Sequence, residues 1–147
     1  MEKNVSDLWF DFAMQFVDKK NLAGGDWGSL TEAEQEVAAL WLLEGDMYNG
    51  GFLQFFCNWG YEAYLHAVRA LNTITAPKAL AILTDCYEVI DAYKDDPRLE
   101  ALWDIPKVLT EEESDTLEDQ DEQFWEDEDK LSEKAYAHYY LSLQLKP

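Results

Sequence analysis

The sequence predicts an all-α fold, a single compact bundle-like domain of five to seven helices. Apolar residues recur at intervals of three and four along several segments, and helix boundary signals separate these segments. No stretch alternates apolar and polar residues with a period of two for long, which argues against strands. The chain has 147 residues, 48% of them hydrophobic, which is enough for one hydrophobic core. We therefore expect one domain over residues 1–147, without internal repeats.

Two helices are expected in the first third of the chain. The first covers residues 5–20, because its apolar residues form one stripe and two lysines suit its C-terminal end. The second follows Thr31, which matches a capping box with Glu34, and ends near Tyr48. Asn49-Gly50-Gly51 then stops it, because Asn and Gly adopt left-handed backbone geometry at low cost.

The middle of the chain predicts a short helix that restarts at Phe52 and a further helix over residues 62–74, with Leu65, Val68 and Leu71 facing inward. Pro77 opens the next helix, since proline is tolerated in a first helical turn. Its apolar stripe is formed by Ala79, Leu80, Leu83, Cys86, Tyr87 and Ile90.

The last third is less regular. The periodicity weakens over residues 92–110, where two prolines indicate a loop with one helical turn. From Thr116 to about Leu145 the spacing fits one long helix, or two helices joined near Asp127 to Asp129.

Motifs for catalysis or metal binding are scarce. His66 follows Glu62 by four residues, which is more typical of a surface pair on one helix than of a catalytic site. Cys57 and Cys86 are far apart and predict buried thiols of a reducing cytoplasm rather than a disulfide or zinc site. We therefore expect no enzyme activity, no cofactor and no metal. A hydrolase that uses Glu44, His66 and carboxylates with a metal is the third-ranked interpretation.

The charge and the N-terminal sequence indicate where the protein acts. The formal net charge of −20 repels phosphate backbones, so we expect no direct binding of nucleic acid. No basic start with an apolar run precedes the first helix, and no uncharged stretch is apolar enough to span a bilayer. We therefore expect a cytoplasmic protein that is not associated with a membrane.

An acidic segment over residues 111–129 is the most informative feature. It supplies −12 of the net charge of −20 and contains no cation. As a helix it would carry roughly 0.4 negative charges per Å, against about 0.6 per Å for B-DNA. Its carboxylates are the expected phosphate-mimicking residues: Glu111, Glu112, Glu113, Asp115, Glu118, Asp119, Asp121, Glu122, Glu126, Asp127, Glu128 and Asp129.

Three apolar residues interrupt this segment and are expected to hold one face of it against the core: Leu117, Phe124 and Trp125. An ordered surface of carboxylates could then dock in the basic groove of a DNA-binding protein, such as a transcription factor or nucleoid protein, and block its DNA site. Asp95, Asp96 and Glu100 are further candidates for this surface.

Two other interpretations of the acidic segment stay open. Acidic runs are often solvated faces that serve solubility. Alternatively, the acidic face neutralises a basic toxin, as in an immunity or antitoxin-like protein, and the sequence does not separate this function from DNA mimicry.

A second motif begins in the last turns of the expected second helix and continues beyond it. Its residues are Glu44, Asn49, Gly50, Gly51, Phe52, Gln54, Phe55, Phe56 and Asn58. It resembles the signature of a bacterial family, domain of unknown function 4375, whose best-known members are DNA-mimic proteins. The resemblance covers roughly residues 30–145. The resemblance implies an all-helical protein that is often dimeric, so a homodimer is expected. It also implies a DNA-binding partner whose DNA site this protein occupies.

The residues of this motif indicate structure rather than catalysis. The Asn-Gly-Gly turn and an aromatic wedge would pack locally, while Gln54 and Asn58 satisfy backbone groups that the turn leaves unpaired. The alternative is a small pocket on which Glu44, Gln54 and Asn58 converge.

Overall fold

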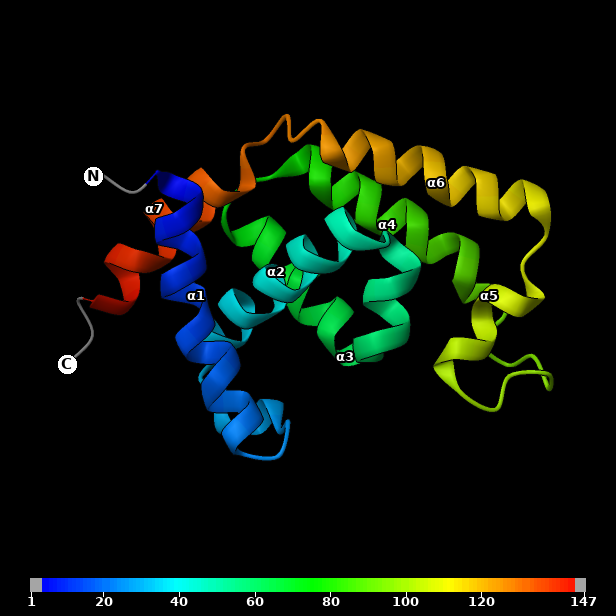
Figure 1. Cartoon of the computed structure of the whole chain (residues 1–147), viewed down its shortest axis with the longest axis horizontal. Helices are drawn as coiled ribbons and strands as arrows, with labels where there is room; N and C mark the ends of the chain where they lie inside the picture. Colours follow the sequence, from blue (N-terminus) through cyan, green and yellow to red (C-terminus); the bar gives the residue numbers. More distant parts are fainter. Residues whose placement is uncertain (1–3, 145–147) are drawn as a thin grey trace.

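The structure is a computed structural model that describes the backbone of residues 4–144 and the side chains of residues 4–140. Its helices are α1 (Val5–Leu22), α2 (Glu32–Asn49), α3 (Phe52–Thr73), α4 (Pro77–Asp91), α5 (Ile105–Val108), α6 (Glu111–Trp125) and α7 (Leu131–Gln144) (Figure 1). Two 3-10 turns, Trp27–Ser29 and Leu102–Asp104, lie between them. Since residues 4–144 form no strand, the predicted all-α fold is confirmed.

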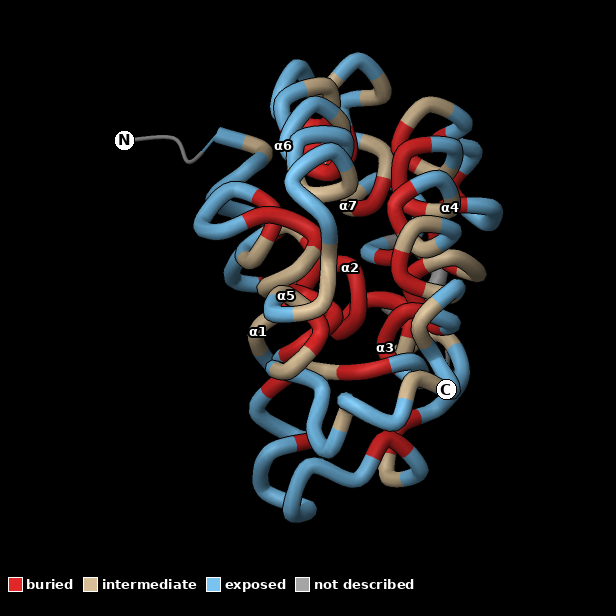
Figure 2. Tube along the Cα trace, turned by 90° about the vertical axis from the view of Figure 1, so that its right-hand side faces the viewer, coloured by how far each residue is buried: buried red, intermediate tan, exposed pale blue. Residues whose placement is uncertain are grey.

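Helices α2 and α3 form the centre of the structure and pack against each other. α1 lies along α2 and is covered by α7, while α4 packs on α3. α6 lies alongside α4 at the edge of the molecule and touches the end of α2 and the start of α3 (Figure 1). Buried residues gather on the inner sides of these helices, whereas α6 is mostly exposed (Figure 2). None of the helices within residues 4–144 is long and apolar enough for a bilayer crossing.

The helix boundaries in the first half agree with the local signals. Thr31 Oγ1 accepts a hydrogen bond from the Glu34 N–H, and Glu34 Oε1 accepts one from the Thr31 N–H, so the predicted capping box is confirmed. The predicted restart at Phe52 is confirmed as the start of α3, and the boundary expected before the helix over residues 62–74 is a kink within α3 at Gly60, where φ is +81°. The inward position of Leu65 was predicted wrongly: its side chain is 45% exposed, because alanines and Tyr64 form the buried stripe of this helix.

The last two helices differ in one boundary from the expectation. α6 begins at Glu111 rather than Thr116, because Thr110 and Glu113 form a second capping box, and Thr110 lies seven residues before Leu117, the first apolar residue of the helix. Of the two alternatives for this region, one long helix or two helices joined near Asp127 to Asp129, the structure has the second. Asp127 has a φ of +51°, and its carboxylate accepts a hydrogen bond from the Leu131 N–H at 3.0 Å, which starts α7.

Candidate functional site

The outward face of α6 carries seven exposed carboxylates, which we call the outer stripe: Glu111, Glu112, Asp115, Glu118, Asp119, Glu122 and Glu126. They recur in steps that keep them on one side of a helix. The opposite side is buried through Leu117 and Phe124, which are 2% and 3% exposed. Within residues 4–140, no ion pair involves a member of the outer stripe.

α6 is seated on the turn between α2 and α3. The Trp125 indole N–H donates to the Met47 carbonyl at 2.6 Å. The buried Asp121 carboxylate accepts the Phe52 N–H at 2.9 Å, at the N-terminus of α3, where the helix dipole favours a negative charge. Burial raises the pKa of Asp121 to about 6, against the effect of this hydrogen bond. Asp121 therefore holds α6 in place, contrary to its expected place on the partner-binding surface.

The backbone conformation at position 51 explains why this turn contains a glycine there. Its φ of +90° with a ψ of −170° is a conformation that side chains other than glycine rarely adopt. A Cβ atom there would also overlap the Asp121 carboxylate. The predicted end of the second helix at this turn is confirmed, since α2 ends at Asn49. Within the turn the positive φ is confined to Gly51, because Gly50 has a φ of −144° and Asn49 is still helical.

Four acids near the ends of α6 are not part of the outer stripe. Glu113 belongs to the capping box and accepts the Tyr93 hydroxyl at 2.6 Å. Asp127 starts α7, and Asp129 accepts the Ala79 N–H at 2.8 Å in the first turn of α4. Glu128 is exposed and lies 3.9 Å from the Lys78 ammonium. These residues join elements of the fold or face a cation, unlike the outer stripe.

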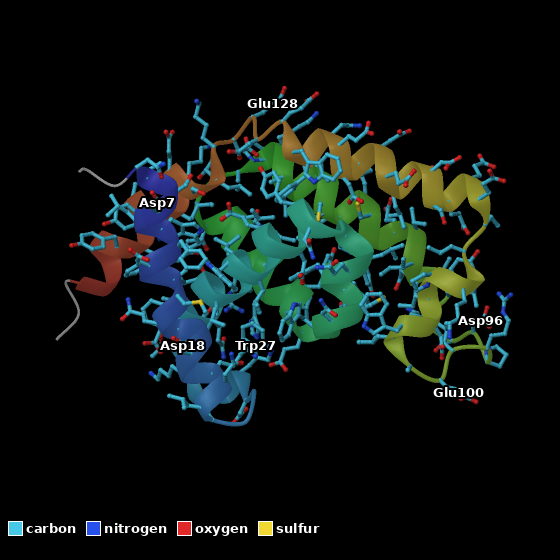
Figure 3. All side chains as sticks on the ribbon, viewed as in Figure 1. Asp7, Asp18, Trp27, Asp96, Glu100 and Glu128 are labelled. Carbon is cyan, nitrogen blue, oxygen red and sulfur yellow. The ribbon has the colours of Figure 1, made fainter. Side chains whose placement is uncertain are left out.

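The additional candidates lie elsewhere. Asp96 and Glu100 are on the loop before α5, at the opposite end of α6 from Glu128 and below its outward face in this view (Figure 3). Asp96 binds the Arg98 guanidinium at 2.7 Å, and these hydrogen bonds lower the pKa of Asp96 to about 2. This loop therefore does not extend the outer stripe.

The motif after α2 is organised by a carboxylate that the sequence interpretation missed. Asp46 accepts hydrogen bonds from Gln54 Nε2 and Trp59 Nε1, both at 2.8 Å, and from Asn58 Nδ2 at 3.5 Å. Gln54 and Asn58 therefore bind this side chain, and the expectation that they satisfy backbone groups was wrong. The expected wedge has four aromatic residues. Three of them are buried, at 0%, 0% and 6% exposure, namely Phe52, Phe55 and Phe56, and Trp59 is partly buried against the core.

Glu44 faces away from this network. Its carboxylate accepts the Trp9 indole N–H at 2.6 Å and the Ser132 hydroxyl at 3.0 Å, linking α1, α2 and α7. The alternative pocket shared with Gln54 and Asn58 is therefore excluded. Burial, with a smaller contribution from the nearby Asp127, raises the pKa of Glu44 to about 7.

The hydrolase interpretation also lacks a site in the structure. His66 packs on the Trp27 ring at 4.9 Å and lies 3.1 Å from an Arg69 guanidinium nitrogen, and shares no partner with Glu44. Burial and Arg69 lower the pKa of His66. In the described part of the chain, no three His, Cys, Asp or Glu side chains are grouped to hold a metal ion. Cys57 and Cys86 are free and buried, as predicted.

The raised pKa values predict that the protein is most stable at mildly acidic pH. Folded Glu44 and Asp121 keep their protons up to about pH 7 and 6, whereas the unfolded carboxyls lose them near pH 4. The two carboxyls should therefore lower the free energy of unfolding by about 4 kcal/mol between pH 5 and pH 8, and the lowered pKa of His66 offsets part of this decrease. Urea unfolding across this range measures it. The Glu44→Gln variant should show a smaller decrease, and an equal decrease would contradict the assignment to Glu44.

Comparison with known proteins gives one match. No curated protein and no solved structure is significantly similar to the chain. The sequence model described as DMP19-like protein, a family of DNA-mimic type, matches residues 28–143. This match agrees with the expected relation to DNA-mimic proteins over roughly residues 30–145. The matched residues include α6 and the turn between α2 and α3 on which α6 packs. Because the match covers most of the sequence, the chain belongs to the DMP19-like protein family.

Proposed function

We propose that this protein is a DNA mimic whose outer stripe occupies the DNA-binding surface of a basic DNA-binding protein. The observation that carries the proposal is the set of seven exposed carboxylates on one side of α6, none of which forms an ion pair with a described side chain. Membership of a DNA-mimic type of family supports it. The partner would be a transcription factor or nucleoid protein, which this acidic surface attracts electrostatically.

The axial spacing of these charges favours the proposal. From Glu111 to Glu126 the helix rises by about 22 Å, so its seven outer-stripe carboxylates follow one another at a mean axial spacing of roughly 3.8 Å. One strand of B-DNA carries one phosphate per about 3.4 Å of axis. Two further exposed acids, Asp85 and Glu88, lie on α4, which packs beside α6. They would supply a second row of negative charge next to the first.

Rigid attachment also supports mimicry over a solvated face. An unattached acidic run would be disordered, because its like charges repel and bury no apolar surface. Here two apolar side chains, the Asp121 carboxylate and the Trp125 indole fix α6 to the core. The charges are thus held in place before any partner arrives, which lowers the entropy cost of binding.

The signature motif takes part in this arrangement. We propose that residues Asn49 to Asn58 carry the signature of the family, as the resemblance to domain of unknown function 4375 implies. The turn they form positions Met47 and Phe52, the backbone partners of Trp125 and Asp121.

The proposal is tested with two variants of equal charge. In the first, Asp115, Glu118, Glu122 and Glu126 of the outer stripe become the corresponding amides. In the control, four exposed acids elsewhere become amides: Asp7, Asp18, Asp95 and Glu100 (three of them labelled in Figure 3). Each immobilised protein captures partners from an extract of the source organism at low salt, and duplex DNA is then added to displace them.

The expected result is a basic DNA-binding protein that the wild type and the control retain and that duplex DNA displaces. The outer-stripe variant should bind it about 30-fold more weakly, because four charge contacts of roughly 0.5 kcal/mol each are lost. Binding by the wild type should also weaken steeply with salt. Equal loss in both variants would show that net charge alone matters and would refute the proposal. Capture of a basic protein that duplex DNA does not displace would favour the immunity-protein alternative.

A further inference from the structure

A surface pocket of about 270 Å³ lies between α1, α2 and the start of α7, beyond the C-terminal end of α6. Four aromatic side chains line it: Trp9, Phe10, Trp41 and Tyr48. The Phe10 and Trp41 rings meet edge to face with their centroids 5.4 Å apart. Phe10 and Tyr48 are each 49% exposed, so a ligand can reach the aromatic walls from solvent.

The polar groups of this pocket are acidic. Glu44 lines it, and its two known hydrogen bonds, from Trp9 and Ser132, leave part of its acceptor capacity unused. The charge of Asp127 also acts on Glu44 and Tyr48. Among residues 4–140, whose side chains the structure describes, no lysine or arginine lines the pocket. An apolar cavity with a partly desolvated carboxyl group attracts a positively charged ligand and disfavours an anion.

The aromatic lining selects among cations. A guanidinium group carries five N–H donors, and among the described residues that line this pocket Glu44 is the only charged acceptor, so several donors would be buried without partners. An ammonium whose hydrogens are replaced by methyl groups has few or no donors to satisfy. It spreads its charge over methyl groups that pack against aromatic faces, as in other aromatic cages.

We propose that this pocket binds a methylated ammonium group, with the aromatic side chains Phe10, Trp41 and Tyr48 as its walls and Glu44 as its counter-charge. The site is separate from the outer stripe and does not depend on the proposed function. The ligand group occurs both in free quaternary amines and in methylated lysine side chains of proteins, and the experiment distinguishes these sources.

The test uses choline and its neutral isostere 3,3-dimethyl-1-butanol, titrated at pH 8, where Glu44 is mostly ionised. NMR chemical shifts of the tryptophan indole N–H groups report binding, since Trp9 donates to Glu44 and Trp41 lines the pocket. Choline should bind at least about fivefold more tightly than the isostere, which is the effect of a cation–π contact of about 1 kcal/mol. Equal binding of both, or of neither, would overturn the proposal.

Variants locate the site. Glu44→Gln and Phe10→Ala should each weaken choline binding by about fivefold. Phe10 is half exposed, so its removal leaves the fold intact and keeps the test valid if Glu44→Gln unfolds the protein. Tyr61→Ala is the control, because Tyr61 is 50% exposed but lines a different pocket, which contains Lys94. Unchanged choline binding in Phe10→Ala would contradict the assignment.

A second titration compares choline with acetylated, amidated trimethyllysine. Tighter binding of the trimethyllysine would point to a methylated side chain of a partner protein. Equal or tighter binding of choline would point to a free quaternary amine. Both outcomes support the site, and they identify the source of its ligand.

Discussion

Replacing Gly51 with alanine is expected to destabilise the protein by about 3 kcal/mol, because the backbone at this position is available essentially only to glycine. The new methyl group would also displace the Asp121 carboxylate from the Phe52 N–H. Both effects act at the seat of α6, so this helix should loosen first. Urea unfolding followed by tryptophan fluorescence measures the loss, and amide hydrogen exchange in α6 locates it.

Gly45→Ala is the matched control for this substitution. Gly45 is in α2, and a Cβ atom there would meet no other atom within 4 Å. Alanine in a helix interior should stabilise the protein by about 0.5–1 kcal/mol. Similar stability for Gly51→Ala and Gly45→Ala would contradict the role given to the turn.

Replacing Arg69 with methionine is the second substitution with a large expected effect, a loss of about 3 kcal/mol. Arg69 Nε donates to the Glu36 carboxylate at 2.7 Å, and Tyr139 donates its hydroxyl to the same carboxylate at 2.6 Å. The Glu36 side chain is 8% exposed, so without Arg69 its charge is buried with a single neutral partner. The contact between α2, α3 and α7 would then contain the buried Glu36 carboxylate without its ion-pair partner. Urea unfolding at pH 7 measures the loss.

Arg98→Met tests whether the effect is specific to burial. The Arg98 side chain is 61% exposed in its ion pair with Asp96, and exposed pairs contribute only about 0.2–1 kcal/mol. If the two methionine variants lose the same stability, the argument from the buried Glu36 carboxylate fails.

The sequence predicted those parts of the fold that depend on near neighbours. The capping box at Thr31, the opening of α4 at Pro77 and the break before α7 each depend on a few consecutive residues. The late start predicted for α6 came from reading the apolar stripe alone. Its capping box, Thr110 with Glu113, was visible in the sequence and would have given the correct boundary.

The site depended on contacts between distant residues, which local patterns do not contain. Asp121 lies four residues after Leu117 and three before Phe124, so helical spacing places it beside the buried side of α6. The sequence does not show that it caps a helix that begins 69 residues earlier. Glu44 binds Ser132, which is 88 residues away. The acidic segment could be recognised from composition, but which of its carboxylates face solvent is decided by the packing of α6 on the α2–α3 turn.

The side chains of the outer stripe do not pack against the core, so the stability of the fold depends little on which residues occupy these positions. Substitutions among these seven positions would leave the buried side of α6 and its seat unchanged, and replacing an acid there would relieve repulsion between like charges. Relatives with this architecture could therefore change the pattern of surface charge, and with it the choice of partner, at little cost in stability. In such a protein, specificity can evolve one side chain at a time on an unchanged scaffold.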